Sequence, residues 1–192
     1  MRYIVFDIET KMAPFSRGRL DVRELELTVV GVYDSQTSAY TAYLLDELPK
    51  LWPLIEQAEL LIGFNSDSFD IPLLNRYYPG DLSKIRSLDI LTEVYQALGR
   101  RIRLDTLARA TLGRGKIGDG AKAGEWWENG EFDKVKEYCL EDVRLTKELY
   151  DYALAHHALK YKDLNQTKEI KIDTSGWNKE TASPSMTHAL PL

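Results

Sequence analysis

The sequence of 192 residues contains a single cysteine and only three histidines. One cysteine, Cys139, excludes an intramolecular disulfide and suits a reducing compartment, and we expect it to be a small residue of the core. His156 and His157 are adjacent, so on a helix their side chains would point about 100° apart, which makes a poor pair of metal ligands. The sequence therefore argues against a histidine or cysteine metal site.

No apolar run approaches the length of a membrane span, and nothing repeats internally. The segment from Met1 to Asp7 leads directly into a charged motif, so we do not expect a cleavable signal peptide. Residues 113–118 fit Gly-x-Gly-x-x-Gly, but they follow a helical pattern instead of a strand, which excludes a dinucleotide site of the usual kind. These absences predict a cytoplasmic protein without a membrane partner.

Acidic residues exceed basic ones, 30 against 25, and the net charge of −5 argues against binding nucleic acid through bulk charge. The charges are unevenly distributed along the sequence, because the segment from Arg100 to Lys122 holds seven basic residues and two acidic ones. We expect Arg100, Arg101 and Arg103 to contact a phosphate backbone. The alternative is an ordinary solvated surface with helix charges such as Arg109.

The chain is long enough for one compact domain with a core of its own. Patterns of apolar residues predict an α/β fold with a mixed sheet flanked by helices. Strands are expected at 2–9, 27–33, 38–44, 60–64 and 85–88, and helices at 45–57, 69–76, 91–98, 105–112 and 132–157. Ser68, Asp89 and Asp105 are expected to cap helices.

The character of the sequence changes near residue 160. We assign residues 1–160 to the domain and residues 161–192 to a C-terminal extension. Within it, residues 168–173 could form an isolated strand, and residues 174–192 are polar and rich in Ser, Thr and Pro. That tail is expected to be loosely held, or to dock on a protein partner.

Acidic residues recur where one site could collect them. Asp7 and Glu9 share a face of the first strand, Asp70 begins a short helix, and Tyr138 and Asp142 lie one turn apart on the last helix. Four converging carboxylates repel one another unless divalent cations neutralise them. Hard oxygen ligands suit Mg²⁺ or Mn²⁺, so the set predicts metal-dependent phosphate chemistry with two ions per site.

The order and spacing of these residues resemble the DEDDy group of 3′-to-5′ exonucleases in the ribonuclease H-like superfamily, especially the proofreading exonuclease domain of family-B DNA polymerases. The resemblance covers roughly residues 1–158. The motif Asp-x-Glu matches Asp7 and Glu9, Asn-x-x-x-Phe-Asp matches Asn65, Phe69 and Asp70, and Tyr-x-x-x-Asp matches Tyr138 and Asp142. Glu137 stands where the sister group has a catalytic histidine, which favours the tyrosine subtype.

The resemblance implies a ribonuclease H-like fold and a role for each acid. Asp7 would bridge two ions, Glu9 and Asp142 would complete the ion on the nucleophile side, and Asp70 would hold the second. Tyr138 would orient the attacking water, since an ordinary pKa near 10 makes it a poor base at neutral pH. Asn65 and Phe69 would contact the substrate, with Phe69 near the terminal nucleotide.

The implied activity is release of nucleoside 5′-monophosphates from the 3′ end of a single strand, DNA in preference to RNA. Two other hypotheses stay open: an exoribonuclease that trims 3′ ends, and a binding module that has lost catalysis. The presence of all four acids and the tyrosine counts against the second. Trp126 and Trp127 fit either core packing or stacking on a base.

Overall fold

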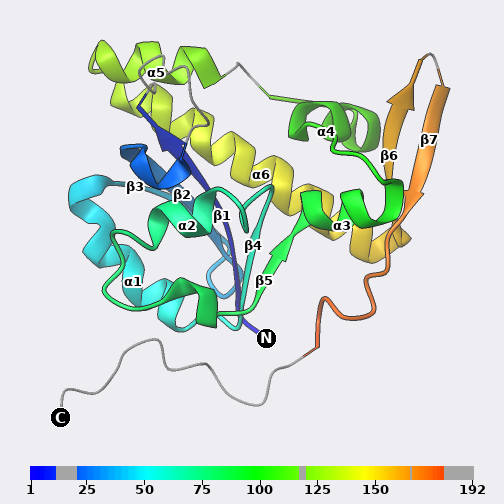
Figure 1. Cartoon of the computed structure of the whole chain (residues 1–192), viewed down its shortest axis with the longest axis horizontal. Helices are drawn as coiled ribbons and strands as arrows, with labels where there is room; N and C mark the ends of the chain where they lie inside the picture. Colours follow the sequence, from blue (N-terminus) through cyan, green and yellow to red (C-terminus); the bar gives the residue numbers. More distant parts are fainter. Residues whose placement is uncertain (12–20, 117–119, 165, 180–192) are drawn as a thin grey trace.

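In a computed structural model, a five-stranded sheet of order β3-β2-β1-β4-β5 is covered by helices, and β6 and β7 form a separate two-stranded sheet (Figure 1). The structure describes residues 1–11, 21–116, 120–164 and 166–179. The strands are β1 (Tyr3–Thr10), β2 (Leu27–Asp34), β3 (Ala39–Leu44), β4 (Leu60–Gly63), β5 (Ser87–Asp89), β6 (Ala158–Asp163) and β7 (Gln166–Lys171). The helices are α1 (Leu48–Glu56), α2 (Asp70–Leu74), α3 (Ile90–Leu98), α4 (Leu104–Leu112), α5 (Gly120–Glu128) and α6 (Phe132–His156). Short 3-10 helices lie at Val22–Glu24, Leu45–Glu47 and Leu82–Lys84.

The sheet is mixed, which confirms the predicted fold class. Strands β1, β2 and β3 are antiparallel neighbours, whereas β1, β4 and β5 run parallel. The central strand β1 is an almost continuous apolar run, as expected for a strand covered on both faces. Its pairing with β4 ends at Val5, so the second half of β1 extends past β4.

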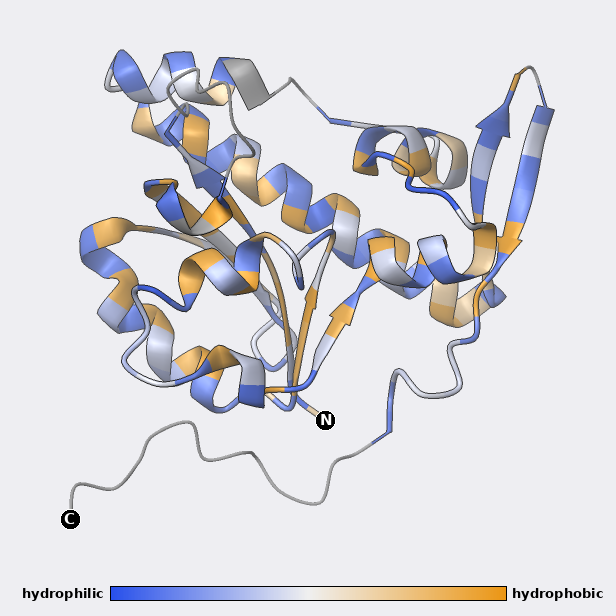
Figure 2. Cartoon of the chain, viewed as in Figure 1, coloured by the Kyte–Doolittle hydropathy of each residue, from blue (hydrophilic) through white to orange (hydrophobic). Residues whose placement is uncertain are grey.

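Each face of the sheet carries its own hydrophobic core. Val5, Tyr33 and Ile62 pack toward α6, and the alternate residues Ile4 and Phe6 pack toward α1 and α2. The strands at the centre of the sheet are mostly hydrophobic, whereas hydrophobic and hydrophilic residues alternate along the helices (Figure 2). Because Asp7 and Glu9 follow Val5 in the same alternation, they lie on the face that α6 covers.

Gly31 lets α6 approach the sheet closely. A Cβ atom at this position would lie 2.9 Å from the Sγ atom of Cys139 and 3.1 Å from Cγ2 of Val143, both on α6. Gly31 is also the β2 residue paired with Asp7. The close approach of helix to sheet therefore occurs beside the first acid of the predicted site.

One of the three predicted helix caps is observed. Asp89 caps α3 as predicted, accepting hydrogen bonds from the amides of Leu91 (2.9 Å) and Thr92 (3.4 Å). The prediction for Ser68 is wrong, because α2 begins without a side-chain cap and the Ser68 hydroxyl donates to Oδ1 of Asn65 (2.8 Å).

The predictions around α4 and α5 also need correction. Asp105 does not cap α4, since the helix already begins at Leu104 and the Asp105 carboxylate accepts from Arg109 one turn later (2.9 Å). Helix α5 was not predicted at all. Its sequence of small and charged residues with two tryptophans has no clear helical period of apolar positions.

The C-terminal extension packs against the body of the protein. The strand expected near residue 168 is observed as β7, paired with β6 instead of isolated. Leu159, Ile170 and Trp177 belong to the same core as α6, and Trp177 stacks on Tyr150 at 5.5 Å between ring centroids. The expectation of a loosely held tail over residues 174–192 is wrong for residues 174–179, since Thr174 and Trp177 are buried, and residues 180–192 lie outside the described part of the chain. None of the helices in the described part of the chain is long and apolar enough to cross a membrane.

Candidate active site

The five residues predicted to be catalytic line one cavity of about 250 Å³. They come from three segments that are distant in sequence: β1, the start of α2, and α6. The lining residues are Asp7, Ile8, Glu9, Thr10, Phe64, Asn65, Phe69, Asp70, Lys116, Tyr138 and Asp142. The structure thus brings both carboxylates of β1, the other two acids and Tyr138 together, with Asn65 and Phe69 beside them. Their catalytic roles stay predictions.

The early end of β4 opens the place where Asp70 enters. In the described part of the chain, no strand pairs with β1 on that side beyond Val5. The amide of Ile8 then donates to Oδ1 of Asp70 at 3.1 Å, which holds this carboxylate beside Asp7 and Glu9. Asp70, from the second motif, thereby accepts a hydrogen bond from a backbone amide of β1 that a neighbouring strand would otherwise accept.

Asn65 shapes the segment that follows β4. Its backbone is left-handed, with φ of 69°, a conformation that asparagine tolerates better than most residues. Asp89 fixes the segment by accepting from the amides of Asn65 (2.8 Å) and Asp67 (3.3 Å), in addition to capping α3. The sequence predicted only the cap. The second function depends on a loop that passes over the end of β5, which no local pattern indicates.

Lys116 is the site residue that sequence reasoning missed as a member of the acid cluster. Its Nζ atom pairs with Oδ2 of Asp142 and lies 5.5 Å from the ring centroid of Tyr138. Its amide donates to Oδ1 of Asp105 at 2.8 Å, and a Cβ atom on Gly115 would come within 2.2 Å of that same oxygen. Asp105 of α4 and the absence of a side chain at Gly115 therefore hold the loop that carries Lys116 against this helix.

Burial and mutual repulsion oppose ionisation of the acids. Burial, and then the carboxylates of Asp142, Asp70 and Glu9, raise the pKa of Asp7 well above its ordinary value. Burial and Asp142 raise the pKa of Glu9 to about 8, and burial raises that of Asp70 to about 7 despite the Ile8 amide. Burial also raises the pKa of Asp142, although Lys116 opposes the shift. Among the described residues lining the cavity, one cation faces four carboxyl groups.

The acids fit divalent cations. Asp142 is 2% exposed, and its Oδ1 atom is buried without a hydrogen-bond partner among the described residues. Ligand atoms of Asp7, Glu9 and Cys139 lie within 4.8 Å of one another. Oxygen-rich, negatively charged clusters of this kind suit Mg²⁺ or Mn²⁺, which would supply the missing positive charge. An acidic cluster able to hold a metal is thus present.

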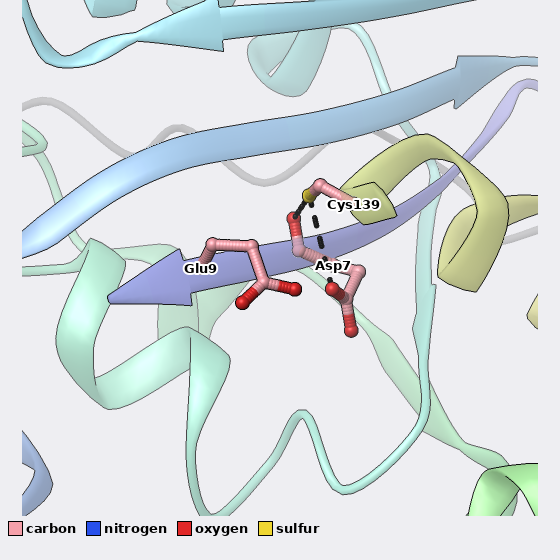
Figure 3. Close-up of side chains that lie close together, drawn as sticks. All are labelled: Asp7, Glu9 and Cys139. Atoms are coloured by element: carbon pink, nitrogen blue, oxygen red, sulfur yellow. Dashed lines mark hydrogen bonds between the residues drawn. The ribbon is translucent and has the colours of Figure 1, made fainter. Parts of the chain in front are cut away.

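Cys139 lies against the back of Asp7 (Figure 3). It is fully buried, as predicted, and its Sγ atom lies 3.4 Å from the backbone oxygen of Asp7 and 3.8 Å from Oδ2. Burial and the adjacent carboxylates raise the pKa of the thiol well above its ordinary value, so it stays protonated and can donate. We interpret Cys139 as a packing residue that supports Asp7.

The hydroxyl of Tyr138 is protonated at neutral pH. Burial raises its pKa to about 12. Trp126 packs edge-on against its ring at 6.2 Å, and Trp127 packs against Phe132 at 4.7 Å. These contacts favour core packing over base stacking for the two tryptophans. A tyrosine that is protonated at neutral pH can donate a hydrogen bond but cannot act as a base.

Only part of the basic segment lies near the acids. Arg101 and Arg103 line an adjoining cavity of about 700 Å³ that also reaches Asp7 and Tyr138, and Arg101 donates to Oδ1 of Asn65. Arg100 is not among the residues that line this cavity. Two other cations of the segment are engaged elsewhere: Arg109 pairs with Asp105 at 2.9 Å, and Arg114 pairs with Glu141 and Glu148.

The raised pKa of Glu9 leads to a stability prediction. The carboxyl has an ordinary pKa of 4.5 and a folded-state pKa of about 8. Below pH 4.5 the carboxyl is protonated in both the folded and the unfolded protein. As the pH rises above that value, the unfolded chain releases the proton first, so the free energy of unfolding falls until the pH passes about 8. In EDTA we therefore expect Glu9→Gln to exceed the parent protein in free energy of unfolding at alkaline pH by about 1–3 kcal/mol, less than the full shift because the group is partly solvated.

Urea unfolding of both proteins across the pH range measures this difference. At a pH below 4.5 the two proteins should be equally stable. Glu128→Gln, at an exposed position of α5, is the matched control and should show no pH-dependent gain. A constant difference between Glu9→Gln and the parent at all pH values would contradict the prediction.

Comparisons with known proteins agree with this geometry. A family model described as the RNase_H superfamily matches residues 4–154. DNA polymerase 1 of Aeropyrum pernix is 32% identical over 166 residues, which cover 72% of this chain but 16% of that polymerase. A solved structure of the family B DNA polymerase from the hyperthermophilic archaeon Pyrobaculum calidifontis superposes with a TM-score of 0.61 at 19% identity, covering 80% of this chain and 24% of the other. The similarity inferred from the motifs is confirmed.

Proposed function

The chain belongs to the RNase_H superfamily, and on that basis we propose that it is a metal-dependent 3′-to-5′ exonuclease that releases nucleoside 5′-monophosphates from single-stranded DNA. One observation carries the proposal: Asp7, Glu9, Asp70 and Asp142 converge on one cavity together with Tyr138. Superfamily membership and this cluster together support nuclease activity. The 3′ polarity and the choice of DNA rest on the motif resemblance and on the two DNA polymerases among the similar proteins.

The four acids would hold two divalent cations, which lower the pKa of a bound water and offset charge on the attacking and leaving oxygens. The side chains of the protein would contribute by holding these cations in position. Asp7 interacts with the other three carboxylates, so it would help to hold both cations. Asp142 offers an unsatisfied oxygen from α6, and Asp70 approaches the edge of β1, where the amide of Ile8 donates to it.

Tyr138 and Lys116 would act on the water and the phosphate. The Tyr138 hydroxyl keeps its proton, so its role is to donate to the attacking water and fix its direction. The ammonium of Lys116 is already directed at Asp142 beside it and can stabilise negative charge that develops on the phosphate. Arg101 and Arg103 are placed along the adjoining cavity to hold the strand that leads to the scissile bond.

Tyr138→Phe should lower turnover by about 10²-fold, the low end of the range for a group that positions or transfers a proton. The substitution removes one hydroxyl, leaves the four acids in place, and keeps the ring that packs on Trp126. Single-turnover hydrolysis of a labelled oligonucleotide measures the effect. Tyr95→Phe, at an exposed position of α3, is the control. A loss as large as that caused by Asp7→Ala would show that Tyr138 does more than position the water.

The proposed activity is tested with purified protein and oligonucleotides of DNA and RNA labelled at the 5′ or the 3′ end. With Mg²⁺ or Mn²⁺ we expect a ladder that shortens 5′-labelled DNA one nucleotide at a time, and immediate release of a labelled mononucleotide from the 3′ end. Faster degradation of RNA would favour the exoribonuclease. Binding without degradation of either would overturn catalysis and leave the binding module.

A further inference from the structure

The β6–β7 hairpin contributes no residue to the cavity of the acids. It lies next to α4 at one end of the molecule (Figure 1). The Thr111 hydroxyl donates to the backbone oxygen of Lys160 (3.1 Å) and accepts from its amide (2.9 Å), which ties β6 to α4. Leu159 and Tyr161 are buried below. The inner edge of the hairpin is therefore fixed in place relative to the residues that precede α4.

A hollow of about 390 Å³ lies between that edge and the start of α4. It is lined by Arg100, Arg101, Ile102, Arg103, Thr106, Tyr161 and Lys162. Four of these seven residues are cations, and none is acidic. Arg101, Ile102, Arg103 and Thr106 also line the cavity that reaches Asp7 and Tyr138. The two hollows therefore adjoin, and the positive one lies on the side of these residues toward the hairpin.

Two of its cations are available to a ligand. Arg103 and Lys162 are exposed, and in the part of the chain that the structure describes neither has a carboxylate partner. This contrasts with Arg109 and Arg114, which acidic side chains neutralise. Unpaired cations in a hollow without acids attract a polyanion with regularly spaced charges.

Arg100 adds a flat surface. Its guanidinium lies 5.1 Å from the ring centroid of Tyr161 and 4.0 Å from the carboxylate of Asp163, and its side chain remains 55% exposed. A guanidinium that covers an aromatic ring on one side can stack on a base on the other. Stacking of this kind requires an unpaired base, which a single strand offers and a duplex does not.

We propose that Arg100, Arg103, Tyr161 and Lys162 form a second binding site for single-stranded nucleic acid, which holds the phosphates and a base upstream of the 3′ end. The inference rests on the proposed function, because it places the 3′ end among the acids. It assigns a role to a hairpin that lies beyond the motifs. Strands that reach the hairpin should consequently bind more tightly than strands too short to do so.

The test is binding of fluorescently labelled oligothymidylates, from a dinucleotide to a dodecanucleotide, measured by anisotropy in EDTA so that the strand is not degraded. Affinity of the unmodified protein should rise with length. The double variant Arg103→Gln/Lys162→Gln should bind the dodecanucleotide about tenfold more weakly, equivalent to about 1.4 kcal/mol. Its slope of log affinity against log salt should be flatter by about 1.4, since each contact to a single strand contributes about 0.7.

Lys171→Gln removes one charge from the same hairpin, outside both hollows, and should bind like the parent protein. Unchanged affinity and salt slope in the double variant would overturn the proposal, as would an equal loss in Lys171→Gln or equally tight binding of a blunt duplex. Failure of the unmodified protein to bind any length would also overturn it. Length-dependent binding without hydrolysis in Mg²⁺ would instead refute the exonuclease and leave this site standing.

Discussion

Asp7→Ala is expected to reduce turnover by about 10³-fold or more while the protein stays folded. Asp7 interacts with the carboxylates of Glu9, Asp70 and Asp142, so its loss affects every cation the site could hold. A reduction of that size corresponds to roughly 4 kcal/mol of lost transition-state stabilisation. Asp142→Asn should have a comparable effect, because it removes the charge of an acid of this cavity that offers a buried oxygen without a hydrogen-bond partner among the described residues.

The fold should tolerate the change at Asp7. Among the described residues, its carboxylate accepts one hydrogen bond, a long one from the thiol of Cys139 at 3.8 Å, and the strand is held by backbone pairing. Removing a carboxyl whose pKa is raised by burial and by its neighbours also relieves repulsion. In EDTA the variant should therefore melt at the same temperature as the parent or slightly higher.

Single-turnover rates and thermal unfolding of the same preparations separate the two effects. Asp133→Ala, an exposed acid on α6, is the control for loss of a carboxylate outside the cavity. Turnover of Asp7→Ala equal to that of the parent would refute the site. A collapse of the melting temperature would show that Asp7 is structural, in which case Asp142→Asn becomes the decisive variant.

The strands and the acids could be predicted because their signals are local. A strand such as β1 shows itself through a continuous apolar run, and alternation alone places Asp7 and Glu9 on one face. The helical period of α6 likewise sets Tyr138 and Asp142 one turn apart. That these faces meet was inferred from resemblance. The structure adds a physical reason: Gly31, paired with Asp7, leaves room for α6.

Features that depend on distant segments were missed. Lys116 looks like one more cation of a basic segment, and its place beside Asp142 depends on a loop docked on Asp105. The same holds for Asp89, whose second set of hydrogen bonds reaches a loop 22 to 24 residues away in sequence. A local sequence pattern indicates which face of a strand or helix a residue occupies. It does not indicate which distant loop packs against that face, so these contacts could not be predicted from the sequence.

Removal of divalent metal should abolish activity. In EDTA we expect the rate to fall by at least about 10³-fold, and addition of Mg²⁺ or Mn²⁺ to restore it. Ca²⁺ should support it poorly, because its longer bonds and variable coordination misplace the attacking water. Full activity in EDTA would refute the metal-dependent mechanism altogether.

Metal binding should also be linked to pH and to stability. Glu9 and Asp70, with pKa values of about 8 and about 7, must lose protons before they can bind a cation. Affinity for Mg²⁺ should therefore rise as pH increases through this range and level off above it. A ligand that binds only the folded protein raises its melting temperature, so Mg²⁺ should stabilise the parent more at pH 8.5 than at pH 6. The same titration on Asp7→Ala should give a much smaller shift, and an equal shift would place the metal elsewhere.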